Sequence, residues 1–580
     1  MSWHSTLEQT PGTEAQSPVS AKTRRDALCL VLLCVITLLT WIPRMAGPID
    51  LRWDAGVYYI LGTSLAEGKG YRLLNEPGHI QAVQYPPLLP AIVAIYQKVL
   101  QSHHPATVGT ALRRSFIVFS LLYIVFTFLL ARLFLPRSWA FLLSLLCLLN
   151  YDMYFLSTLC FAELPFALFS TLFAYLYYRK GEGSISRRFA PLAAIACYFL
   201  RTAGITLLAA WVGDALLRKQ FRQAAVRIAV AAVPVFLWQS YVGRVESGYT
   251  YRHPYYAYQR DPSMFYNVSY ARNMALKSPF EPDLGNATTG DMIRRVLDNA
   301  TAMPSSLGQA AYSKRNFWRG HVATINAKLK HYQLPIWPFD LFYNLMGLLV
   351  IAGIAWECWH RQWLLAGTLI LTVAAICTTP WPGQFGRYFA PVVPLLLLAV
   401  FQLLRNAHTL LRKVFPSVSR SAIRGAVYVL LLAFAMQSVL DLISGNMNFL
   451  YRASYQTAGG GKKTYRLLHY LAAYPSTAEA LHWLVSRADS QTVLVLSMPH
   501  WAYLETGLQA VMPPLTTDPV KAQQMLDSVP AKYVLIDQLL GEDNFAHNFP
   551  AMLHSFPDKW KQVYSSKGGD IIIFERTQAN

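Results

Sequence analysis

Long apolar runs recur along most of this 580-residue chain and are separated by polar or basic segments. A helix needs about 20 predominantly apolar residues to cross the bilayer core. We therefore predict a mainly α, polytopic membrane protein with about eleven transmembrane helices. The runs fall at about 27–46, 115–135, 138–156, 161–178, 189–202, 203–217, 225–243, 339–357, 362–380, 387–404 and 423–444.

Basic residues indicate which ends of these helices face the cytoplasm, because Lys and Arg accumulate in cytoplasmic loops. With the tail 1–26 in the cytoplasm, every loop predicted to lie inside carries basic residues, 19 in total. The short runs 189–202 and 203–217 then become two helices that meet at the outer face, near Arg201. The segment 445–580 is predicted to be extracytoplasmic.

The composition excludes a soluble enzyme and a disordered chain. Hydrophobic residues make up 54% and charged residues 14% of the sequence, against about 45–50% and about 25% in soluble proteins. Cytoplasmic loops account for the net charge of +20, so no nucleic-acid partner is expected. The seven cysteines show no disulfide or metal-ligand spacing, which favours the inner (plasma) membrane of a bacterium.

Three segments are left outside the membrane. Two are the outer loops 47–114 and 244–338 of the transmembrane domain 27–444. In the first loop, 86–101 is apolar but short, which predicts a helix lying in the membrane interface. The third segment, 445–580, has balanced charge and alternates between strand and helix patterns, which predicts a small α/β domain.

The pattern of the C-terminal segment predicts its elements individually. Ser476 and Glu479 fit a capping box that opens a helix to about Ala488. Strands are expected at 491–497 and 532–537, a helix at 518–529, and a hairpin of 562–566 with 570–576. The run Gly459–Gly461, followed by two lysines, is interpreted as a flexible linker because no strand pattern precedes it.

Carboxylates near the outer ends of the predicted spans are candidate catalytic groups. Asp54 follows the first span and is a candidate general base for an acceptor hydroxyl, although an Asp at a helix start is also typical of a cap. Asp152 and Glu163 flank the outer ends of the third and fourth spans. Glu163 precedes Pro165 by two positions, so capping is an alternative for it too.

Two arginines are predicted at the same outer face. Arg201 lies between two apolar runs, and Arg387 begins another one. A guanidinium there suits bidentate binding of a phosphate, while snorkelling to the interface is the alternative. Arg113 and Arg114 are also predicted outside, against the positive-inside bias, which favours contact with lipid phosphate or indicates a miscounted span.

Motifs of other chemistries are absent from the sequence. It contains no Ser–His–Asp arrangement, HExxH, Walker loop or cluster with metal-ligand spacing. No metal ligands and no cofactor are therefore predicted.

Several short motifs, in this order, resemble GT-C glycosyltransferases. They are RWDAGVYY from Arg52, GKGY from Gly68, YPPLLP from Tyr85, AELPF from Ala162, LRTAG from Leu200 and RYFAPVVP from Arg387. Together they resemble the protein mannosyltransferase-like group, which includes the bacterial lipid A aminoarabinose transferases. The similarity covers about residues 25–405.

The resemblance implies a membrane enzyme that moves a sugar from a polyprenyl-phosphate carrier to a lipid, glycan or protein acceptor on the outer face. It matches Asp54 to the catalytic carboxylate of the family. For such a reaction we expect Arg201 and Arg387 to neutralise the charge on the departing phosphate. Glu163 is a second catalytic candidate, expected to orient hydroxyl groups of the acceptor or the sugar. Further substrate contacts are expected from Tyr59, Tyr85, Asp152 and Tyr388. The nearest relatives need no divalent metal, whereas oligosaccharyltransferases of the superfamily use one, so a metal is not excluded.

The sequence departs from the group at two positions. Tyr85 stands where the aminoarabinose enzymes often carry a basic residue, and Ala55 follows Asp54 where a second acid is common. Two other functions remain open from the sequence. One is a transporter of lipid or polysaccharide, and the other is a non-catalytic scaffold that uses its α/β domain as a binding module.

Overall fold

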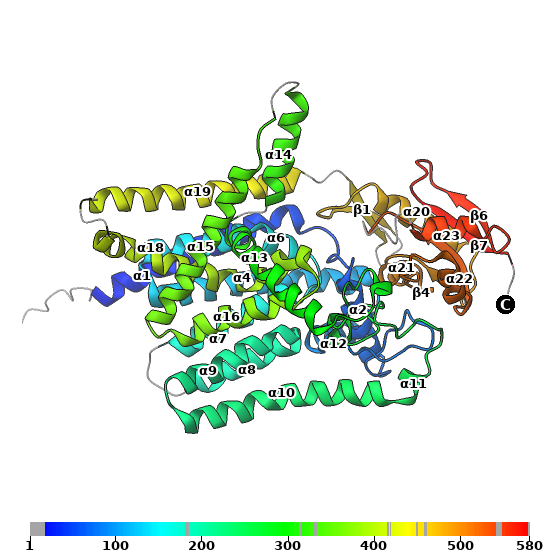
Figure 1. Ribbon diagram of the computed structural model, residues 1–580, viewed down its shortest axis with the longest axis horizontal. Coiled ribbons are helices and arrows are strands. Elements are labelled where there is room, and N and C mark those ends of the chain that lie inside the picture. The colour runs from blue at the N-terminus through cyan, green and yellow to red at the C-terminus, as the bar shows by residue number, and fades with distance from the viewer. Residues whose placement is uncertain are drawn as a thin grey trace, which may run out of the picture.

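The computed structural model describes residues 18–179, 185–312, 315–329, 333–414, 417, 419–447, 451–456, 461–540 and 548–577. Long helices lie side by side over most of the chain, and a smaller α/β domain sits at one end of the bundle (Figure 1). The N-terminal residues 1–17 of the predicted cytoplasmic tail lie outside the described residues.

The helices of the bundle and its outer loops are bounded as follows. They are α1 (Pro18–Trp41), η1 (Ile42–Arg44), α2 (Asp54–Ala66), α3 (Leu88–Leu100), α4 (Pro105–Phe134), α5 (Arg137–Leu149), α6 (Tyr151–Leu156), α7 (Glu163–Tyr178), α8 (Ile185–Leu200), η2 (Thr202–Gly204), α9 (Ile205–Leu217), α10 (Phe221–Ser247), α11 (Tyr249–Arg252), α12 (Tyr270–Met274), η3 (Pro282–Leu284), α13 (Thr289–Ala311), α14 (Arg315–Lys328), α15 (Trp337–Trp359), α16 (Trp363–Cys377), η4 (Pro382–Gln384), α17 (Phe385–Phe389), η5 (Ala390–Val392), α18 (Val393–Val414) and α19 (Arg420–Met447).

Each of the eleven predicted apolar runs is helical in the structure. Within the described part of the chain, six helices are long and apolar enough to cross a membrane, and the count of eleven spans stays a prediction. The run 138–156 is split into α5 and α6 because the Asn150 side chain accepts a hydrogen bond from the Met153 amide, which starts a new helix. The run 189–217 is divided into two short helices, as predicted: α8 ends at Leu200 and α9 begins at Ile205, with Arg201 between them.

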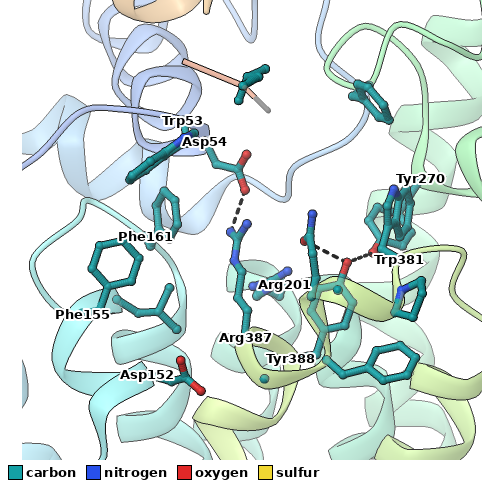
Figure 2. A pocket seen from close by; sticks show the side chains of 18 of the residues that line it. Trp53, Asp54, Asp152, Phe155, Phe161, Arg201, Tyr270, Trp381, Arg387 and Tyr388 are labelled. Atoms are coloured by element: carbon teal, nitrogen blue, oxygen red, sulfur yellow. Dashed lines mark hydrogen bonds and ion pairs between the residues drawn. The ribbon is translucent and has the colours of Figure 1, made fainter. Parts of the chain in front are cut away.

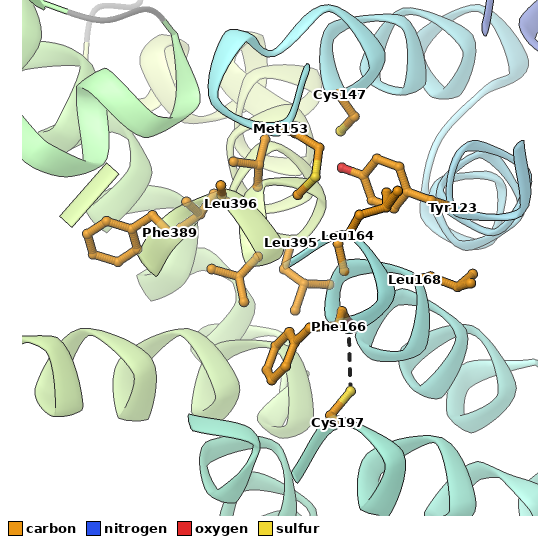
Figure 3. Packing of buried hydrophobic residues seen from close by; sticks show 14 of the residues in the cluster. Tyr123, Cys147, Met153, Leu164, Phe166, Leu168, Cys197, Phe389, Leu395 and Leu396 are labelled. Atoms are coloured by element: carbon orange, nitrogen blue, oxygen red, sulfur yellow. Dashed lines mark hydrogen bonds between the residues drawn. The ribbon is translucent and has the colours of Figure 1, made fainter. Parts of the chain in front are cut away.

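The core of the bundle is a continuous apolar cluster between the helices. Leu164 and Leu168 of α7 are four residues apart on one helix face and are at most 3% exposed. In Figure 3 Leu164 lies between Tyr123 of α4 and Leu395 of α18, and all four side chains belong to this cluster. This packing fixes α7, and therefore the position of Glu163 at its first turn.

The helix predicted at 86–101 in the first outer loop is confirmed as α3. One face of α3 is buried through Leu89 and Val93, whereas Ile95 and Val99 are 60% and 73% exposed. Gly62 lets α2 approach this helix, because a Cβ there would lie 2.6 Å from the Val93 side chain. The exposed apolar face has the character expected of an interfacial helix.

The C-terminal domain contains the predicted α/β sheet. Its elements are β1 (Arg452–Gln456), β2 (Lys462–Arg466), α20 (Ala473–Val485), β3 (Val493–Val495), α21 (Pro499–Thr506), β4 (Gln509–Val511), α22 (Pro519–Asp527), β5 (Ala531–Ile536), α23 (Phe549–Ser555), β6 (Trp560–Ser565) and β7 (Ile572–Arg576). The strand order is β4-β3-β5-β7-β6, with β3 parallel to β4 and β5. β7 is antiparallel to both of its neighbours, so the predicted hairpin of β6 and β7 is confirmed.

Two predictions in this domain need correction. The capping box at Ser476 is wrong, because α20 already begins at Ala473 and the Ser476 amide donates to the Ala472 carbonyl within the helix. Pro475 is tolerated there since it lies in the first turn. The two lysines after the glycine run belong to β2, which pairs antiparallel with β1. Gly459 and Gly460 themselves lie outside the described residues.

A buried ion pair joins the first outer loop to the C-terminal domain. Arg52 donates to Asp50 at 2.7 Å, and both side chains are 1% exposed. The same guanidinium donates to the backbone carbonyls of Leu468 at 2.7 Å and His469 at 3.0 Å. Because Asp54 follows Arg52 by two residues, this contact fixes the start of α2 against the C-terminal domain.

Arg113 does not contact lipid phosphate, one of the two roles considered from the sequence. Its side chain is 3% exposed and donates to the backbone carbonyls of Arg44, Ala46 (2.7 Å) and Pro48. These carbonyls lie in the turn between the first span and α2, where no regular partner is available. Arg113 therefore shapes this turn, while Arg114 is exposed.

We expect Arg113→Met to lower the free energy of unfolding by about 3 kcal/mol, because the buried carbonyls of Arg44 and Pro48 and the part-buried carbonyl of Ala46 lose a charged donor. Thermal melting of the purified protein in detergent measures the effect. The neighbouring exposed Arg114→Met is the matched control and should melt like the wild type. Equal melting of the Arg113 and Arg114 variants would contradict the assigned role.

Candidate active site

A cavity of about 780 Å³ lies between the bundle and the C-terminal domain. Its wall contains two acidic residues, Asp54 and Asp152, and two arginines, Arg201 and Arg387 (Figure 2). The cavity therefore brings together most of the charged residues that the sequence analysis selected. The remaining wall is largely aromatic, with Trp53, Tyr85, Phe155, Phe161, Phe265, Tyr266, Tyr270, Phe280, Trp381, Phe385 and Tyr388.

Asp54 is the first residue of α2, but its side chain does not cap the helix. The N-cap is Trp53, whose backbone is left-handed with φ 54°, and no side chain closes the first turn. The Asp54 carboxylate instead accepts a hydrogen bond from Arg387 Nη2 at 2.6 Å (Figure 2). The capping alternative raised by the sequence is therefore not the role of this side chain.

Glu163 holds both arginines through one carboxylate oxygen. Its Oε1 accepts from Arg387 Nε and from Arg201 Nη1. Glu163 is 0% exposed and is not part of the cavity wall. The prediction that it contacts substrate hydroxyls is therefore corrected: at the start of α7, Glu163 lies behind the arginines and orients them.

Local packing aims the Arg387 side chain into the cavity. The guanidinium lies 4.4 Å from the Phe161 ring centroid, in the range of a cation–π contact. The preceding Gly386 leaves room for Asp152, since a Cβ at this glycine would lie 3.1 Å from Asp152 Oδ2. Asp152 lines the same cavity, as expected for a substrate-contacting residue.

Of the predicted tyrosines, Tyr85 and Tyr388 line the cavity but Tyr59 does not. Tyr59 is 1% exposed, and its hydroxyl donates to the His103 carbonyl at 2.9 Å. With 3.6 residues per turn, the residue four positions after Asp54 shares its helix face, and that residue is Tyr58. Tyr58 packs against Tyr85 with ring centroids 4.9 Å apart.

The environment of Tyr85 keeps its hydroxyl neutral. Burial raises the pKa of Tyr85 well above its ordinary value, and the nearby Asp54 carboxylate adds to the rise. A neutral phenol in the cavity wall donates or accepts hydrogen bonds without adding charge.

A second cavity, of about 310 Å³, adjoins the first. Its wall is mostly apolar and comes largely from α7, α8, α9, α10 and α16, with Phe166, Ile205, Val235 and Ile376 among the lining residues. Five residues line both cavities: Gln84, Tyr85, Arg201, Tyr270 and Tyr388. An apolar chain in the second cavity would therefore place its polar head beside Arg201.

The C-terminal domain also supplies part of the first cavity, although the sequence does not single out the residues that do so. His469, Met512 and Leu540 line it. His469 Nε2 is 2.8 Å from the Tyr151 hydroxyl, so a cavity-lining residue of this domain is hydrogen-bonded to the bundle. No motif in the sequence marks these residues, because their position depends on how the two domains pack.

Two carboxylates at this site are held by an arginine: Asp54, which lines the cavity, and Glu163, which lies behind its wall. Asp54 and Glu163 are each paired with Arg387, whose guanidinium occupies the space between them. Among the described residues, no group of three or more His, Cys, Asp or Glu side chains is placed to hold a metal ion.

Scans against models of protein families and a search of curated proteins gave no match. Solved structures do match. The oligosaccharyltransferase AglB of Archaeoglobus fulgidus, in complex with an inhibitory peptide and a dolichol-phosphate, is 13% identical with a TM-score of 0.52, over 96% of this chain and 75% of its own. The apo form of the oligosaccharyltransferase from that organism has a TM-score of 0.54 at 13% identity and the same coverage.

ArnT of Cupriavidus metallidurans bound to undecaprenyl phosphate also matches, with a TM-score of 0.42 at 13% identity, over 94% of this chain and 97% of its own. At this identity the oligosaccharyltransferase matches show a shared fold. They confirm the GT-C-like, polytopic membrane fold with a small C-terminal α/β domain that the sequence predicts.

Glu163→Gln should lower the free energy of unfolding by about 3–5 kcal/mol, because two arginines then lose their shared buried anion. Thermal melting in detergent measures this loss. Asp298→Asn, at a position with a 72% exposed side chain, is the control and should leave the melting temperature unchanged. If Glu163→Gln melts with the wild type, the carboxylate does not hold the arginines.

Addition of Mn²⁺ or Mg²⁺, or removal of metals with EDTA, should leave the melting temperature unchanged. A ligand that binds only the folded state raises the melting temperature. No such rise is expected here, because Arg387 lies between the Asp54 and Glu163 carboxylates. Differential scanning fluorimetry with each ion checks this expectation. A saturable stabilisation that disappears in Asp54→Asn would contradict it.

Proposed function

We propose that this protein is a membrane glycosyltransferase that transfers a sugar from a polyprenyl-phosphate carrier to a hydroxyl of an acceptor. The supporting observation is the meeting of Asp54, Arg201 and Arg387 in one cavity that adjoins an apolar one. A carboxylate, two guanidinium groups and an apolar groove match the base, leaving group and lipid tail that this reaction involves. The acceptor is a lipid, a glycan or a protein.

The donor fits the two cavities in one orientation. The polyprenyl chain occupies the apolar cavity, and the phosphate lies at the junction, where Arg201 lines both cavities and Arg387 lines the first. Guanidinium groups bind phosphate oxygens in bidentate fashion. AglB and ArnT were solved with dolichol-phosphate and undecaprenyl phosphate, respectively, which supports a polyprenyl phosphate as the carrier class.

The transfer is a direct displacement at the anomeric carbon. The acceptor oxygen forms the new glycosidic bond while the bond between that carbon and the phosphate oxygen breaks. Asp54 takes the proton of the acceptor hydroxyl. Arg387 and Arg201 stabilise the charge that develops on the departing polyprenyl phosphate.

The pairing of Asp54 with Arg387 makes the base dependent on the donor. The donor phosphate competes with Asp54 for the same guanidinium, so its arrival releases the carboxylate toward the acceptor. Glu163 keeps Arg387 in place during this exchange through its bond to Nε. The base therefore becomes available when a donor is bound.

We further propose that the protein lies in the inner membrane of a bacterium and that the reaction takes place on the outer face of that membrane. Arg132 and Arg137, in the loop predicted to be cytoplasmic, both pair with Asp26 near the start of α1. The cavity lies at the other end of the bundle, next to the C-terminal domain (Figure 1). The N-terminus is then cytoplasmic and the C-terminal domain extracytoplasmic.

Asp54→Asn should lower transfer by about 10²–10⁴-fold, the usual contribution of a general base. The assay supplies labelled polyprenyl-phosphate sugars to purified membranes and follows label into lipid, glycan and protein fractions. Retained melting temperature and retained binding of polyprenyl phosphate show that the variant is folded. Asp298→Asn is the control and should transfer like the wild type.

Equal transfer by Asp54→Asn and the wild type would remove Asp54 as the base. Failure of the wild type to transfer any of a broad panel of sugars would contradict the proposed activity itself.

A further inference from the structure

Gln84 lies at the junction of the two cavities. Its side chain lines both of them, although only 8% of the residue is exposed. Arg201 and Tyr388 line both cavities as well, so Gln84 shares the junction with a proposed phosphate-binding arginine. The sequence analysis did not select Gln84, which directly precedes the Tyr85-Pro86-Pro87 motif.

The side-chain carbonyl of Gln84 has an unmet hydrogen-bonding capacity. Its Oε1 is fully buried, and within the described part of the chain no donor reaches it. Nearly all buried side-chain oxygens in folded proteins have a donor, because an unpaired one destabilises the fold. Because Gln84 lines the cavity, a molecule bound there is in a position to supply the missing donor.

The backbone around Gln84 is held by side chains from distant segments. The Tyr241 hydroxyl donates to the Ala82 carbonyl at 3.0 Å, and the Tyr71 hydroxyl donates to the Tyr85 carbonyl at 2.9 Å. Arg260 Nη2 donates to the Gln81 carbonyl at 2.8 Å. The amide group is therefore presented from a fixed backbone, as a specificity-determining side chain needs to be.

We propose that Gln84 Oε1 accepts a hydrogen bond from a hydroxyl group of the sugar being transferred. This inference rests on the proposed function, because the sugar follows the phosphate along the donor. With the chain in the apolar cavity and the phosphate at the junction on Arg201 and Arg387, the sugar lies on the side of the first cavity, which Gln84 also lines. The amide carries no charge, so the ligand that it recognises is a hydroxyl-bearing sugar.

This role makes Gln84 a determinant of donor specificity. A site built to bond a substrate hydroxyl discriminates strongly against the analogue that lacks it, because the polar group of the site is then left unpaired. Discrimination at Gln84 therefore applies to one hydroxyl of the sugar and is lost when Oε1 is removed.

The experiment combines Gln84→Met with donors that lack single hydroxyls. Met is similar in length to Gln but is a weak acceptor. The probes are polyprenyl-phosphate hexoses, intact or deoxy at C2, C3, C4 or C6, and the measurement is kcat/KM for transfer. For the wild type, kcat/KM for one of the deoxy donors should be about 10-fold or more below that for the intact donor. Gln84→Met should use that deoxy donor and the intact donor equally well.

Ser306→Ala is the matched control. Ser306 also lines the cavity, but its hydroxyl already donates to the Ala302 carbonyl of its own helix at 2.9 Å. This variant should keep the discrimination of the wild type. Binding of polyprenyl phosphate without a sugar should be unchanged in Gln84→Met, which separates loss of the sugar contact from loss of the fold.

Two results would overturn the inference. Either Gln84→Met transfers the intact donor as well as the wild type does, or it weakens every donor by the same factor. If the wild type transfers none of the donors, the proposed function fails instead. A binding measurement then tests the inference about Gln84. Calorimetry measures the affinity of the wild type and of Gln84→Met for polyprenyl phosphate with and without its sugar. If the sugar changes the affinity of both proteins by the same factor, the inference is overturned.

Discussion

The structure depends on the way in which Arg387 satisfies two carboxylates from different parts of the chain. Asp54 starts α2, Glu163 starts α7, and Arg387 lies in the short helix α17. Removing one partner of a buried ion pair leaves an uncompensated charge, which is costly in a poorly hydrated site. The contact therefore fixes three elements relative to one another and determines the shape of the cavity.

In the proposed reaction, the same contact prepares the site for an anionic donor. Glu163 is sealed behind the arginines, whereas the Asp54 side chain is 14% exposed. A phosphate that enters the cavity competes with Asp54 for Arg387, while Glu163 continues to hold the guanidinium. Arg52, bound to the carbonyls of Leu468 and His469, keeps the start of α2 in place during this exchange.

Much of the fold and part of the site can be predicted from sequence patterns, whereas the contacts between distant segments cannot. The apolar runs and the charged residues at their outer ends are visible because membrane insertion makes both unambiguous. Their pairing is not visible, since Asp54 and Arg387 are 333 residues apart in sequence. Tyr59 was predicted in place of Tyr58 because the face of α2 depends on where that helix starts. The three-residue strand β4 is too short to show a pattern.

A structure of the protein with polyprenyl phosphate, determined by electron cryomicroscopy, tests the central claim most directly. The account predicts the phosphate within hydrogen-bonding distance of Arg387 and Arg201, the chain in the apolar cavity, and the Asp54 carboxylate separated from Arg387. A phosphate bound elsewhere, or an Asp54–Arg387 pair that stays intact beside it, would contradict the account.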